Sequence, residues 1–521
     1  MRMASSVTPG SPLAKIWTKS DLLALISSKM KEVRLIAVSN REPYVHRHTE
    51  NGLVCIQPAS GLASALDPVM RACGGVWVAH GSGDADREVT DPRGRLKVPP
   101  QHPSYTLRRV WLDKQLEDEY YYGLANEGLW PLCHIAFHRP RFSLRNWESY
   151  RRVNRIFADA VIEEAAGEPA FVFIQDYHFG LLPRMLKNDA PNLQIAQFWH
   201  IPWPNRETLR VFPWQEELLD GMLGNDLLGF HLRDHCANFL DAVAREVEAK
   251  VDRPRGEITR GGKSTVVRPF PISIDFKWHN RAAQSAEVKA EMALWVKRMG
   301  SAPELLGIGI DRLDYTKGIP DRLRALDVFL ETNPQYRGRV AFAQVGVPSR
   351  TQIQDYQDLN AEIDREVSRI NEKWGTGKYK PVHFFKGEYS QTELMGLHRL
   401  ASFCMVSPLH DGMNLVAKEF VASRFDEKGV LILSSFAGAA EELADALLVN
   451  PFSVDEMADA IYRALEMPRD ESQKRMRRLR AATAENTIYR WAAKILMTLL
   501  KIDSSEPAEN GTPATWAAGA A

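Results

Sequence analysis

Two cations stand close together in the segment DRLDYTKGIP, residues 311 to 320. Arg312 and Lys317 are five positions apart and follow the apolar run Leu305 to Ile310. A guanidinium can bind phosphate oxygens through two parallel hydrogen bonds, and an ammonium adds a mobile point charge. We therefore interpret the pair as a clamp for a diphosphate. A surface pair that only solvates a loop is the alternative that the local spacing leaves open.

The segment DGMN, residues 411 to 414, offers a second way to bind an anion. It precedes the helix-like run LVAKEFVAS, so Gly412 would let backbone approach a ligand, and amides at the helix N-terminus would point toward it. These amides belong to Met413, Asn414 and Leu415. Cations and free amides would then converge on one diphosphate.

Glu419 lies eight residues beyond Asp411. A helix repeats every ~3.6 residues, so this spacing is about two turns and places Glu419 near the same ligand. Its carboxylate could accept hydrogen bonds from ribose hydroxyls. An exposed helix carboxylate is the commoner fate of such a residue.

These clusters need a scaffold, and the chain offers strands that alternate with amphipathic helical patterns, which predicts an α/β fold. Most of the strand runs are continuously apolar, as is typical of buried parallel strands. In two doubly wound sheets that face each other, strand ends line one crevice, where ligands of open α/β folds bind. Polar clusters follow the runs at SNR (39–41), QDYH (175–178), HIPWP (200–204), DRLDYTK (311–317), VPSR (347–350) and PLHDGMN (408–414).

A domain boundary is expected after PFPISID, residues 269 to 275, where one strand series ends and a charged helical pattern opens another. At about 100 to 200 residues per domain, a chain of 521 residues predicts two or three domains. We expect a partly disordered N-terminal extension at 1–30, Rossmann-like domains at 31–278 and 279–484, a helix at 485–503 that crosses back to the first domain, and a disordered tail at 504–521.

The amino-acid composition argues against some classes of partner and indicates a cellular compartment. The number of Lys and Arg residues equals the number of Asp and Glu residues, 66 each. The chain therefore has no net positive charge that would attract nucleic acid or an anionic membrane. The sequence contains no run of about 18 apolar residues, so it predicts no membrane-spanning helix. The five cysteines are scattered without CxxC spacing, which argues against a disulfide framework or a zinc site and favours the cytoplasm.

Three motif-like segments carry little weight. GGKST (261–265) lacks the glycine that a P-loop needs five positions earlier, and KRMRRLR (474–480) has no interleaved aromatic residues. Asp84 and Asp86 in GSGDAD are weak evidence for a metal site, since most such pairs bind nothing.

Taken together, the clusters resemble the trehalose-6-phosphate synthase family. The resemblance rests on DRLDYTKGIP, DGMNLVAKE, YYYGLANEGLWPLCH (120–134), QDYH, HIPWP, LLGNDLLGFH (from 222) and SNR, in the family's order over roughly Arg34 to Leu500. The resemblance implies a retaining glucosyltransferase with the GT-B fold, in which two Rossmann-like doubly wound domains face a deep interdomain cleft. The first domain would bind the acceptor and the second the nucleotide sugar.

The resemblance also implies roles position by position. For UDP-glucose these are Arg312 and Lys317 at the diphosphate, Gly61 in the glycine loop, Asp411 at the transferred glucose, Glu419 at the ribose, and Gly412, Met413, Asn414, Leu415 and Val416 along the nucleotide. For glucose 6-phosphate they are Arg41, Tyr121, Trp130, Asp176 and Arg350. His200 matches a position near the transferred glucose and joins Asp411, Arg312 and Lys317 in the expected catalytic set, although a packing histidine beside Pro202 is nearly as good an interpretation.

Several positions depart from the family pattern. Ser60 replaces a glycine, Leu124 and Ala125 replace Phe and Ser, Ser273 replaces Gly, and His410 stands where Arg is usual. His410 is nearest the chemistry, because losing a permanent cation there affects the strength or the pH response of UDP-glucose binding. The loop from Arg41 to Gly61 is also longer than in the best-known members.

The implied reaction moves an α-glucosyl unit from UDP-glucose to the anomeric hydroxyl of glucose 6-phosphate. No obvious second carboxylate supports a double displacement, so the resemblance implies a same-face displacement assisted by side-chain cations. We expect no cofactor and no metal. The expected partners are these two small molecules, with no nucleic acid and no membrane, and a homo-oligomer is left open.

Two other functions stay open. One is a related synthase with another phosphorylated acceptor, such as glycerol 3-phosphate for glucosylglycerol phosphate, and the other is a non-catalytic sugar-phosphate sensor. The presence of Arg350 favours the hexose phosphate, and the presence of Asp411, Arg312, Lys317 and Glu419 speaks against the sensor. The sequence does not choose among UDP, GDP and ADP. No DxDGT motif appears, so we expect no fused phosphatase half.

Overall fold

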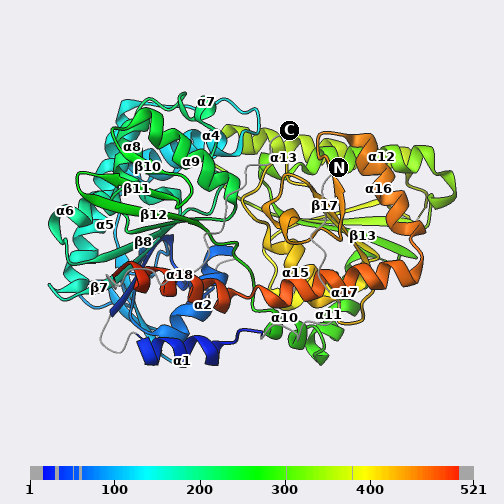
Figure 1. The fold of residues 1–521 in the computed structure, drawn as a ribbon. Helices are drawn as coiled ribbons and strands as arrows, with labels where there is room; N and C mark the ends of the chain where they lie inside the picture. Colours follow the sequence, from blue (N-terminus) through cyan, green and yellow to red (C-terminus); the bar gives the residue numbers. More distant parts are fainter. Residues whose placement is uncertain are drawn as a thin grey trace, which may run out of the picture.

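The computed structural model describes residues 16–29, 34–50, 52–57, 61–300, 302–377 and 379–503. Most of the predicted N-terminal extension and the whole predicted tail at 504–521 therefore lie outside the described residues. Figure 1 shows two sheet-containing halves side by side.

The first half is built on a ten-stranded sheet in the order β10-β11-β12-β9-β8-β7-β1-β4-β6-β5. Neighbours pair in parallel from β12 to β6 and antiparallel at the edges. Numbered along the chain, the parallel strands lie in the order 3-2-1-4-5-6-7, so the strand order reverses between β1 and β7. The strands are β1 (Arg34–Arg41), β4 (Val76–His80), β5 (Arg95–Val98), β6 (Tyr105–Val110), β7 (Ala170–Gln175), β8 (Gln194–Phe198), β9 (Leu227–Phe230), β10 (Lys250–Asp252), β11 (Glu257–Arg260) and β12 (Lys263–Pro269).

The second half is built on a six-stranded, fully parallel sheet in the order β15-β14-β13-β16-β17-β18. Its chain order 3-2-1-4-5-6 is that of a doubly wound nucleotide-binding fold, with the reversal between β13 and β16. The α/β, Rossmann-like prediction is thus confirmed. The strands are β13 (Leu305–Arg312), β14 (Val340–Val347), β15 (Val382–Lys386), β16 (Phe403–Val406), β17 (Val430–Ser434) and β18 (Leu447–Val449).

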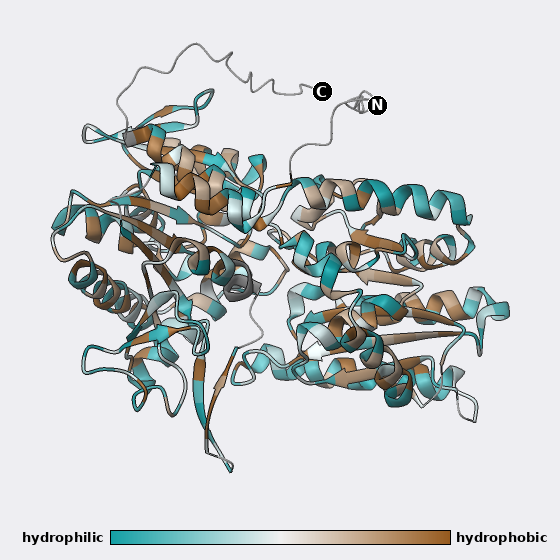
Figure 2. Cartoon of the chain, turned by 90° about the horizontal axis from the view of Figure 1, so that it is seen from below, coloured by the Kyte–Doolittle hydropathy of each residue, from teal (hydrophilic) through white to brown (hydrophobic). Residues whose placement is uncertain are grey.

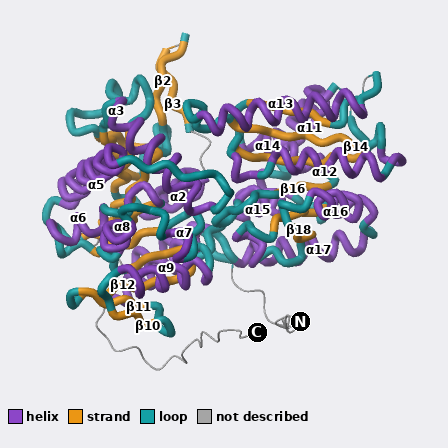
Figure 3. Tube along the Cα trace, turned by 90° about the horizontal axis from the view of Figure 1, so that it is seen from above, coloured by secondary structure: helices purple, strands orange, loops and turns teal. Residues whose placement is uncertain are grey.

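Helices cover both faces of each sheet (Figure 3). In β1, Ile36 and Val38 belong to one buried apolar cluster, whereas Leu35 and Ala37 belong to another. Successive side chains of a strand point to opposite faces, so both faces of the sheet are buried, which explains why its strands read as continuous apolar runs. Figure 2 shows the same layering, with hydrophobic strands between helices whose outer sides are hydrophilic.

The α-helices of both halves have the following bounds. They are α1 (Lys19–Lys29), α2 (Gly61–Cys73), α3 (Lys114–Glu117), α4 (Trp130–His134), α5 (Leu144–Ala165), α6 (Leu182–Asp189), α7 (Arg206–Leu209), α8 (Gln215–Met222), α9 (Arg233–Glu246), α10 (Phe276–Ala282), α11 (Ala286–Met299), α12 (Ile319–Thr332), α13 (Gln354–Trp374), α14 (Gln391–Leu400), α15 (Leu415–Ser423), α16 (Val454–Glu466), α17 (Arg469–Glu485) and α18 (Ile488–Asp503). Short 3-10 turns lie at Tyr177–Phe179, Tyr315–Lys317, Pro334–Tyr336 and Gly438–Glu441. No helix in the described ranges is long and apolar enough to cross a membrane.

The last helix returns to the first half of the molecule. Helix α18 contacts α1, α2, β8 and β9, and Figure 1 shows it in red beside α2 and α1. Its Trp491 packs edge-on against Phe198 of β8, with ring centroids 5.1 Å apart. The end of the chain therefore fastens the second half to the first.

Two features of the first half were not predicted. The segment between α3 and α4 is a π-helix, η1 (Asp118–Leu129), a wide coil that is rare and is found most often at functional sites. The long loop after β1 folds into a hairpin of β2 (Val45–Thr49) and β3 (Gly52–Ile56), which projects from the body in Figure 3.

Candidate active site

Four predicted site residues lie where the strand order of each sheet reverses. Arg41 ends β1 and Asp176 follows β7, while Arg312 ends β13 and Asp411 lies beyond β16. Open α/β sheets bind ligands at this position, because neighbouring connections leave in opposite directions and open a crevice. The fold therefore places the two sets of predicted residues at equivalent points of the two halves.

Residues predicted for the acceptor form one cluster of cations and aromatic rings, called the acceptor cluster below. Nη2 of Arg41 donates to the hydroxyl of Tyr121 at 3.1 Å. The guanidinium of Arg350 lies over the ring of Trp130 at 3.9 Å, and that of Arg312 lies 5.3 Å from the same ring. Arg312 and Arg350 come from the second half and Trp130 from the first, so the cluster spans both halves.

The positive charge of this cluster lowers the pKa of Tyr121. Burial alone would raise the pKa of this phenol, yet the charges of Arg41, Arg350 and Arg312 bring it down to about 7. The cluster therefore favours negative charge strongly enough to overcome the cost of burying it.

Arg350 is held by groups that sequence reasoning did not predict. Its Nη1 donates to Asp314 Oδ2 at 3.2 Å and to the hydroxyl of Tyr356, and its Nη2 donates to the hydroxyl of Tyr177 at 3.3 Å. Asp314 lies inside DRLDYTK and Tyr177 inside QDYH, so both motifs contained the signal. Tyr356 lies in α13, outside every motif.

Several buried polar atoms of the acceptor cluster have no hydrogen-bond partner among the residues that the structure describes. These atoms are Arg350 Nε, Trp130 Nε1, His178 Nε2 and Ser349 Oγ. His178 stacks on Tyr121 with ring centroids 5.8 Å apart. Because an unpaired buried polar group is costly, these four atoms are candidates to bind a polar ligand. His178 was within the QDYH motif but was not predicted as a site residue.

Asp176 is held in a strained backbone conformation at the end of β7. Its φ is 74°, and its carboxylate accepts the backbone N–H of His200 at 3.1 Å. Burial raises the pKa of Asp176 to about 7, and the N–H groups of Tyr177 and His200 reduce that rise. Arg350 (φ 49°) and Asn414 (φ 93°) also have positive φ, so three predicted site residues carry the kind of strain that gathers at functional sites.

The residues predicted for UDP-glucose form an ion pair at the start of α15. Nζ of Lys317 lies 2.6 Å from Oδ2 of Asp411, and Nδ2 of Asn414 donates to the same oxygen at 3.2 Å. Oδ1 of Asn414 accepts the N–H of Ala417 at 3.2 Å and so caps the helix. Burial alone would raise the pKa of Asp411, but Lys317 holds it below its usual value.

The other residues predicted for the nucleotide follow along the same helix. Met413 is buried, Leu415 and Val416 form the first turn of α15, and Glu419 lies one turn further on. Burial raises the pKa of Glu419 to about 7, and a hydrogen bond with Gln391 offsets part of that rise. Nε2 of the buried His279 lies 3.9 Å from Oε1 of Glu419. Gly61 begins α2 in the first half, where its role stays a prediction, and Ser60 lies outside the described residues.

His200 lies where the two halves touch. A Cβ added to Gly412 would lie 2.3 Å from the carbonyl oxygen of His200, so only glycine permits this approach. The ring Nε2 of His200 lies 2.9 Å from Oε1 of Gln175, which assigns the proton to Nε2 and leaves Nδ1 as an acceptor. Burial lowers the pKa of His200 to about 3, so the ring is neutral.

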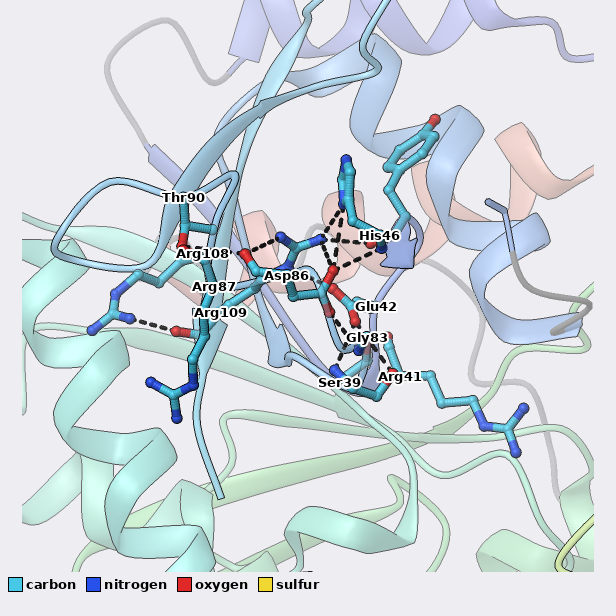
Figure 4. Close-up of polar contacts among 12 residues, drawn as sticks. Ser39, Arg41, Glu42, His46, Gly83, Asp86, Arg87, Thr90, Arg108 and Arg109 are labelled. Carbon is cyan, nitrogen blue, oxygen red and sulfur yellow. Dashed lines mark hydrogen bonds and ion pairs between the residues drawn. The ribbon is translucent and has the colours of Figure 1, made fainter. Parts of the chain in front are cut away.

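A buried charge network supports the chain that follows Arg41. Arg109, fully buried in β6, donates through Nε to Glu42 Oε2 at 2.7 Å and lies 2.8 Å from Asp86 Oδ1. Figure 4 shows Glu42 turned into this network and the side chain of Arg41 pointing away from it. Burial raises the pKa of Glu42 to about 8, with a further contribution from Asp86. The network fixes the backbone from which Arg41 extends.

Asp86 is therefore a structural residue. Its carboxylate accepts the N–H groups of His46 at 2.7 Å and Gly83 at 2.6 Å, besides its ion pair with Arg109. Among the residues that the structure describes, no group of three or more His, Cys, Asp or Glu side chains could hold a metal ion.

Comparison with known proteins places this geometry in a family. The model of glycosyltransferase family 20 matches residues 33–501. The chain is 34% identical over 466 residues to the alpha,alpha-trehalose-phosphate synthase [UDP-forming] of Schizosaccharomyces pombe, covering 88% of this chain and 87% of that protein. It is 37% identical to the bifunctional trehalose-6-phosphate synthase/phosphatase of Thermoproteus tenax, covering 91% of this chain but only 64% of that protein.

Solved structures share the fold. A UDP-forming alpha,alpha-trehalose-phosphate synthase from Burkholderia xenovorans in complex with glucose 6-phosphate matches with a TM-score of 0.80 and 31% identity, over 89% of this chain and 99% of that one. A structure from E. coli bound with UDP-2-fluoro glucose matches with a TM-score of 0.80 and 32% identity, over 90% and 99%. These neighbours confirm the prediction of two facing Rossmann-like halves.

Proposed function

Since the chain belongs to glycosyltransferase family 20, we propose that it is a retaining glucosyltransferase that forms α,α-trehalose 6-phosphate from UDP-glucose and glucose 6-phosphate. Relatives at 34% identity or more carry this activity in their names, and two structural neighbours bind glucose 6-phosphate or a UDP-glucose analogue. One observation in this chain carries the proposal. Arg312 and Arg350 from the second half lie over Trp130 from the first half, close to where the strand order of each sheet reverses. Lys317 pairs with Asp411 in the second half, and Arg41 adds a third arginine from the first half.

The acceptor cluster suits a sugar that bears a phosphate dianion. Arg41 and Arg350 supply guanidinium groups, and the lowered pKa of Tyr121 shows that the site favours negative charge. Trp130 offers an aromatic face to a sugar ring, and Asp176 offers carboxylate oxygens to hydroxyls. The unpaired Nε of Arg350 gives the phosphate a direct partner.

In the proposed reaction, a bond forms between the acceptor's anomeric oxygen and C1 of the glucosyl unit, and the bond from C1 to the UDP phosphate breaks. The proton of the acceptor hydroxyl passes to the departing phosphate oxygen on the same face. Lys317 and Arg312 stabilise the charge that develops on UDP, an electrostatic contribution of ~3 kcal/mol for each well-placed donor. Asp411 orients Lys317 and the glucosyl hydroxyls, and Glu419 binds the ribose.

His200 has a supporting role in this scheme. Its ring is neutral and its Nδ1 is free to accept a hydrogen bond from a glucosyl hydroxyl. Its carbonyl packs against Gly412, so it also sets the distance between the halves.

We propose that the reaction uses no metal, because Lys317 and Arg312 supply positive charge at the diphosphate. Dialysis against EDTA is then expected to leave kcat within about twofold of its starting value, since no ion is removed from the transition state. A loss of activity that Mg²⁺ restores would contradict this.

The test of the function is a substrate panel. Purified protein is incubated with UDP-, GDP- or ADP-glucose and either glucose 6-phosphate or glycerol 3-phosphate, and the product anomers are assigned by NMR. The expected product is the α,α-linked disaccharide phosphate from UDP-glucose and glucose 6-phosphate. Release of UDP without a disaccharide phosphate would overturn the proposal, and a product from glycerol 3-phosphate alone would identify the related synthase.

We further propose that the protein works in the cytoplasm. All five cysteines are free thiols, and three of them are buried, which suits a reducing compartment. Fractionation of the source cells tests the location. Light scattering of the purified chain measures whether it forms the homo-oligomer that the sequence leaves open.

A further inference from the structure

One hydrogen bond joins the loop that carries Asp411 to the helix that carries Trp130. Nδ1 of His410 lies 2.8 Å from the carbonyl oxygen of His134, in the other half of the molecule. A carbonyl only accepts, so Nδ1 of His410 carries the proton and donates it. His134 is the last residue of α4, and Ile135 turns away in a left-handed conformation, so this carbonyl lies at the helix C-terminus, where carbonyls lack partners within the helix.

On the acceptor side, this bond leads directly to Trp130. The ring of His134 packs on Trp130 with centroids 4.0 Å apart, and its Nδ1 lies 2.9 Å from the carbonyl of Trp130. Trp130 also contacts the guanidinium groups of Arg350 and Arg312. A shift of His134 therefore moves the ring on which the acceptor arginines rest.

On the side of UDP-glucose, the bond leads to Asp411, the next residue in the chain. The loop around Asp411 is fixed by its own N–H, which donates to Phe436 O at 3.1 Å, and by its carbonyl, which accepts from Gly438 at 3.1 Å. Such a loop moves as one piece, so His410 cannot shift without moving the carboxylate that pairs with Lys317.

Both histidines are neutral, so the ring of His410 carries a single proton. The hydrogen bond to the carbonyl of His134 requires that this proton be on Nδ1. Burial lowers the pKa of His410 and lowers that of His134 to about 3. His410 thus provides directional hydrogen bonding where the family's usual arginine would provide charge.

We propose that His410 is a positioning residue that couples the binding of UDP-glucose to the binding of the phosphorylated acceptor, through His134 and Trp130. This rests on the proposed function. Occupation of one site stabilises the contact between the halves, and the contact places the second site's residues for its ligand. The consequence is positive cooperativity between two different ligands.

The experiment measures the dissociation constant of UDP by titration calorimetry, with and without saturating glucose 6-phosphate. In the wild-type protein the acceptor is expected to tighten UDP binding by at least about fivefold, the lower end of ordinary coupling between sites. His410→Leu keeps a similar size but removes the donor, and the coupling is expected to fall below about twofold. His410→Asn places an amide N–H where Nδ1 stands and is expected to restore it.

Two controls separate this bond from general effects. UDP alone is expected to bind His410→Leu within about threefold of wild type, which shows that the fold and the nucleotide site are intact. Phe137→Ala removes another contact between the halves, the edge-on packing of Phe137 on Phe452 at 5.9 Å, and is expected to keep the coupling.

Each outcome decides between the alternatives. Coupling that is absent in the wild type, unchanged in His410→Leu, equally lost in Phe137→Ala or not restored by His410→Asn would overturn the role of His410. A wild-type protein that binds neither UDP nor glucose 6-phosphate would overturn the proposed function instead.

Discussion

The two halves of the active site hold their cations in different ways. Lys317 is paired with a carboxylate of its own half, Asp411, at 2.6 Å. Arg41 donates to the hydroxyl of Tyr121, and Arg350 keeps its Nε without a partner although its Nη1 reaches Asp314. One cation is neutralised before any ligand arrives, whereas the acceptor cluster keeps an excess of positive charge.

This difference matches what each site has to do. A paired lysine is oriented but adds little attraction for the ground state, so its charge is most useful when the leaving group becomes more negative in the transition state. The acceptor cluster holds Arg41, Arg312 and Arg350, of which Arg350 pairs with Asp314, so it is expected to attract a dianion from the start and to determine which acceptor binds. We therefore expect variants at Lys317 to change kcat and variants at the acceptor arginines to change KM.

The largest effect is expected for Lys317→Ala. Removal of a preorganised charge from the leaving group is expected to lower kcat by about 10³-fold while KM for UDP-glucose changes by less than about tenfold. Steady-state kinetics measure both constants. Lys373→Ala is a control that also removes a lysine paired with an aspartate, Asp327 at 3.1 Å. Its ion-pair and cation–π partners are not predicted site residues, so the variant should retain wild-type kcat.

A rise in KM with an unchanged kcat in Lys317→Ala would break the comparison, because the lysine would then serve ground-state binding. The variant also leaves Asp411 without its cation in a buried place, which costs stability. Thermal unfolding of the variant, measured with and without UDP, distinguishes such a loss of fold from a loss of catalysis.

Sequence reasoning predicted residues that the folded chain brings together, because each half of the candidate site is encoded by a local motif after a strand. DRLDYTK and PLHDGMN contain Lys317 and Asp411 with their supporting residues, and their strand-end positions followed from the apolar runs before them. The wider support could not be predicted. Tyr356 reaches Arg350 from α13, and Arg109 lies in the charged strand YTLRRV, so only the folded chain shows that each is buried beside the site.

The second prediction concerns Arg41. In Arg41→Gln the acceptor phosphate loses a charge-assisted bond, worth ~1.5 to 3 kcal/mol, so KM for glucose 6-phosphate is expected to rise by about 10- to 100-fold. KM for UDP-glucose is expected to stay within about threefold, because Arg41 is predicted to bind the other substrate. Kinetics with each substrate varied in turn measure both values. Equal rises for the two substrates would contradict a division of labour between the halves.

The third prediction uses the raised pKa of Glu419, about 7. A carboxylate accepts hydrogen bonds from both ribose hydroxyls, whereas the protonated acid loses acceptor capacity. UDP-glucose binding is therefore expected to be strongest above pH 7 and to weaken by up to about tenfold as the pH falls from 7.5 to 6. Calorimetry with UDP-glucose measures this well, since its doubly esterified diphosphate does not titrate in that range.

Glu419→Gln gives the control for this pH dependence. Its affinity for UDP-glucose is expected to be independent of pH over the same interval, because the amide does not titrate. A pH dependence that survives in Glu419→Gln would assign it to another group.

The smallest effect is expected at Tyr121, whose pKa depends directly on the charge of the acceptor cluster. The arginines bring the pKa of this phenol to about 7, so in the free protein it loses its proton as the pH rises through that value. The resulting phenolate competes with the acceptor phosphate for the guanidinium of Arg41, so KM for glucose 6-phosphate is expected to rise by about fivefold between pH 7 and 8. Tyr121→Phe cannot ionise and is expected to abolish that rise, although loss of the hydroxyl raises KM at pH 6.5 by up to about tenfold. Kinetics across the pH range measure both effects. If KM rises equally with pH in Tyr121→Phe, the rise does not come from ionisation of Tyr121.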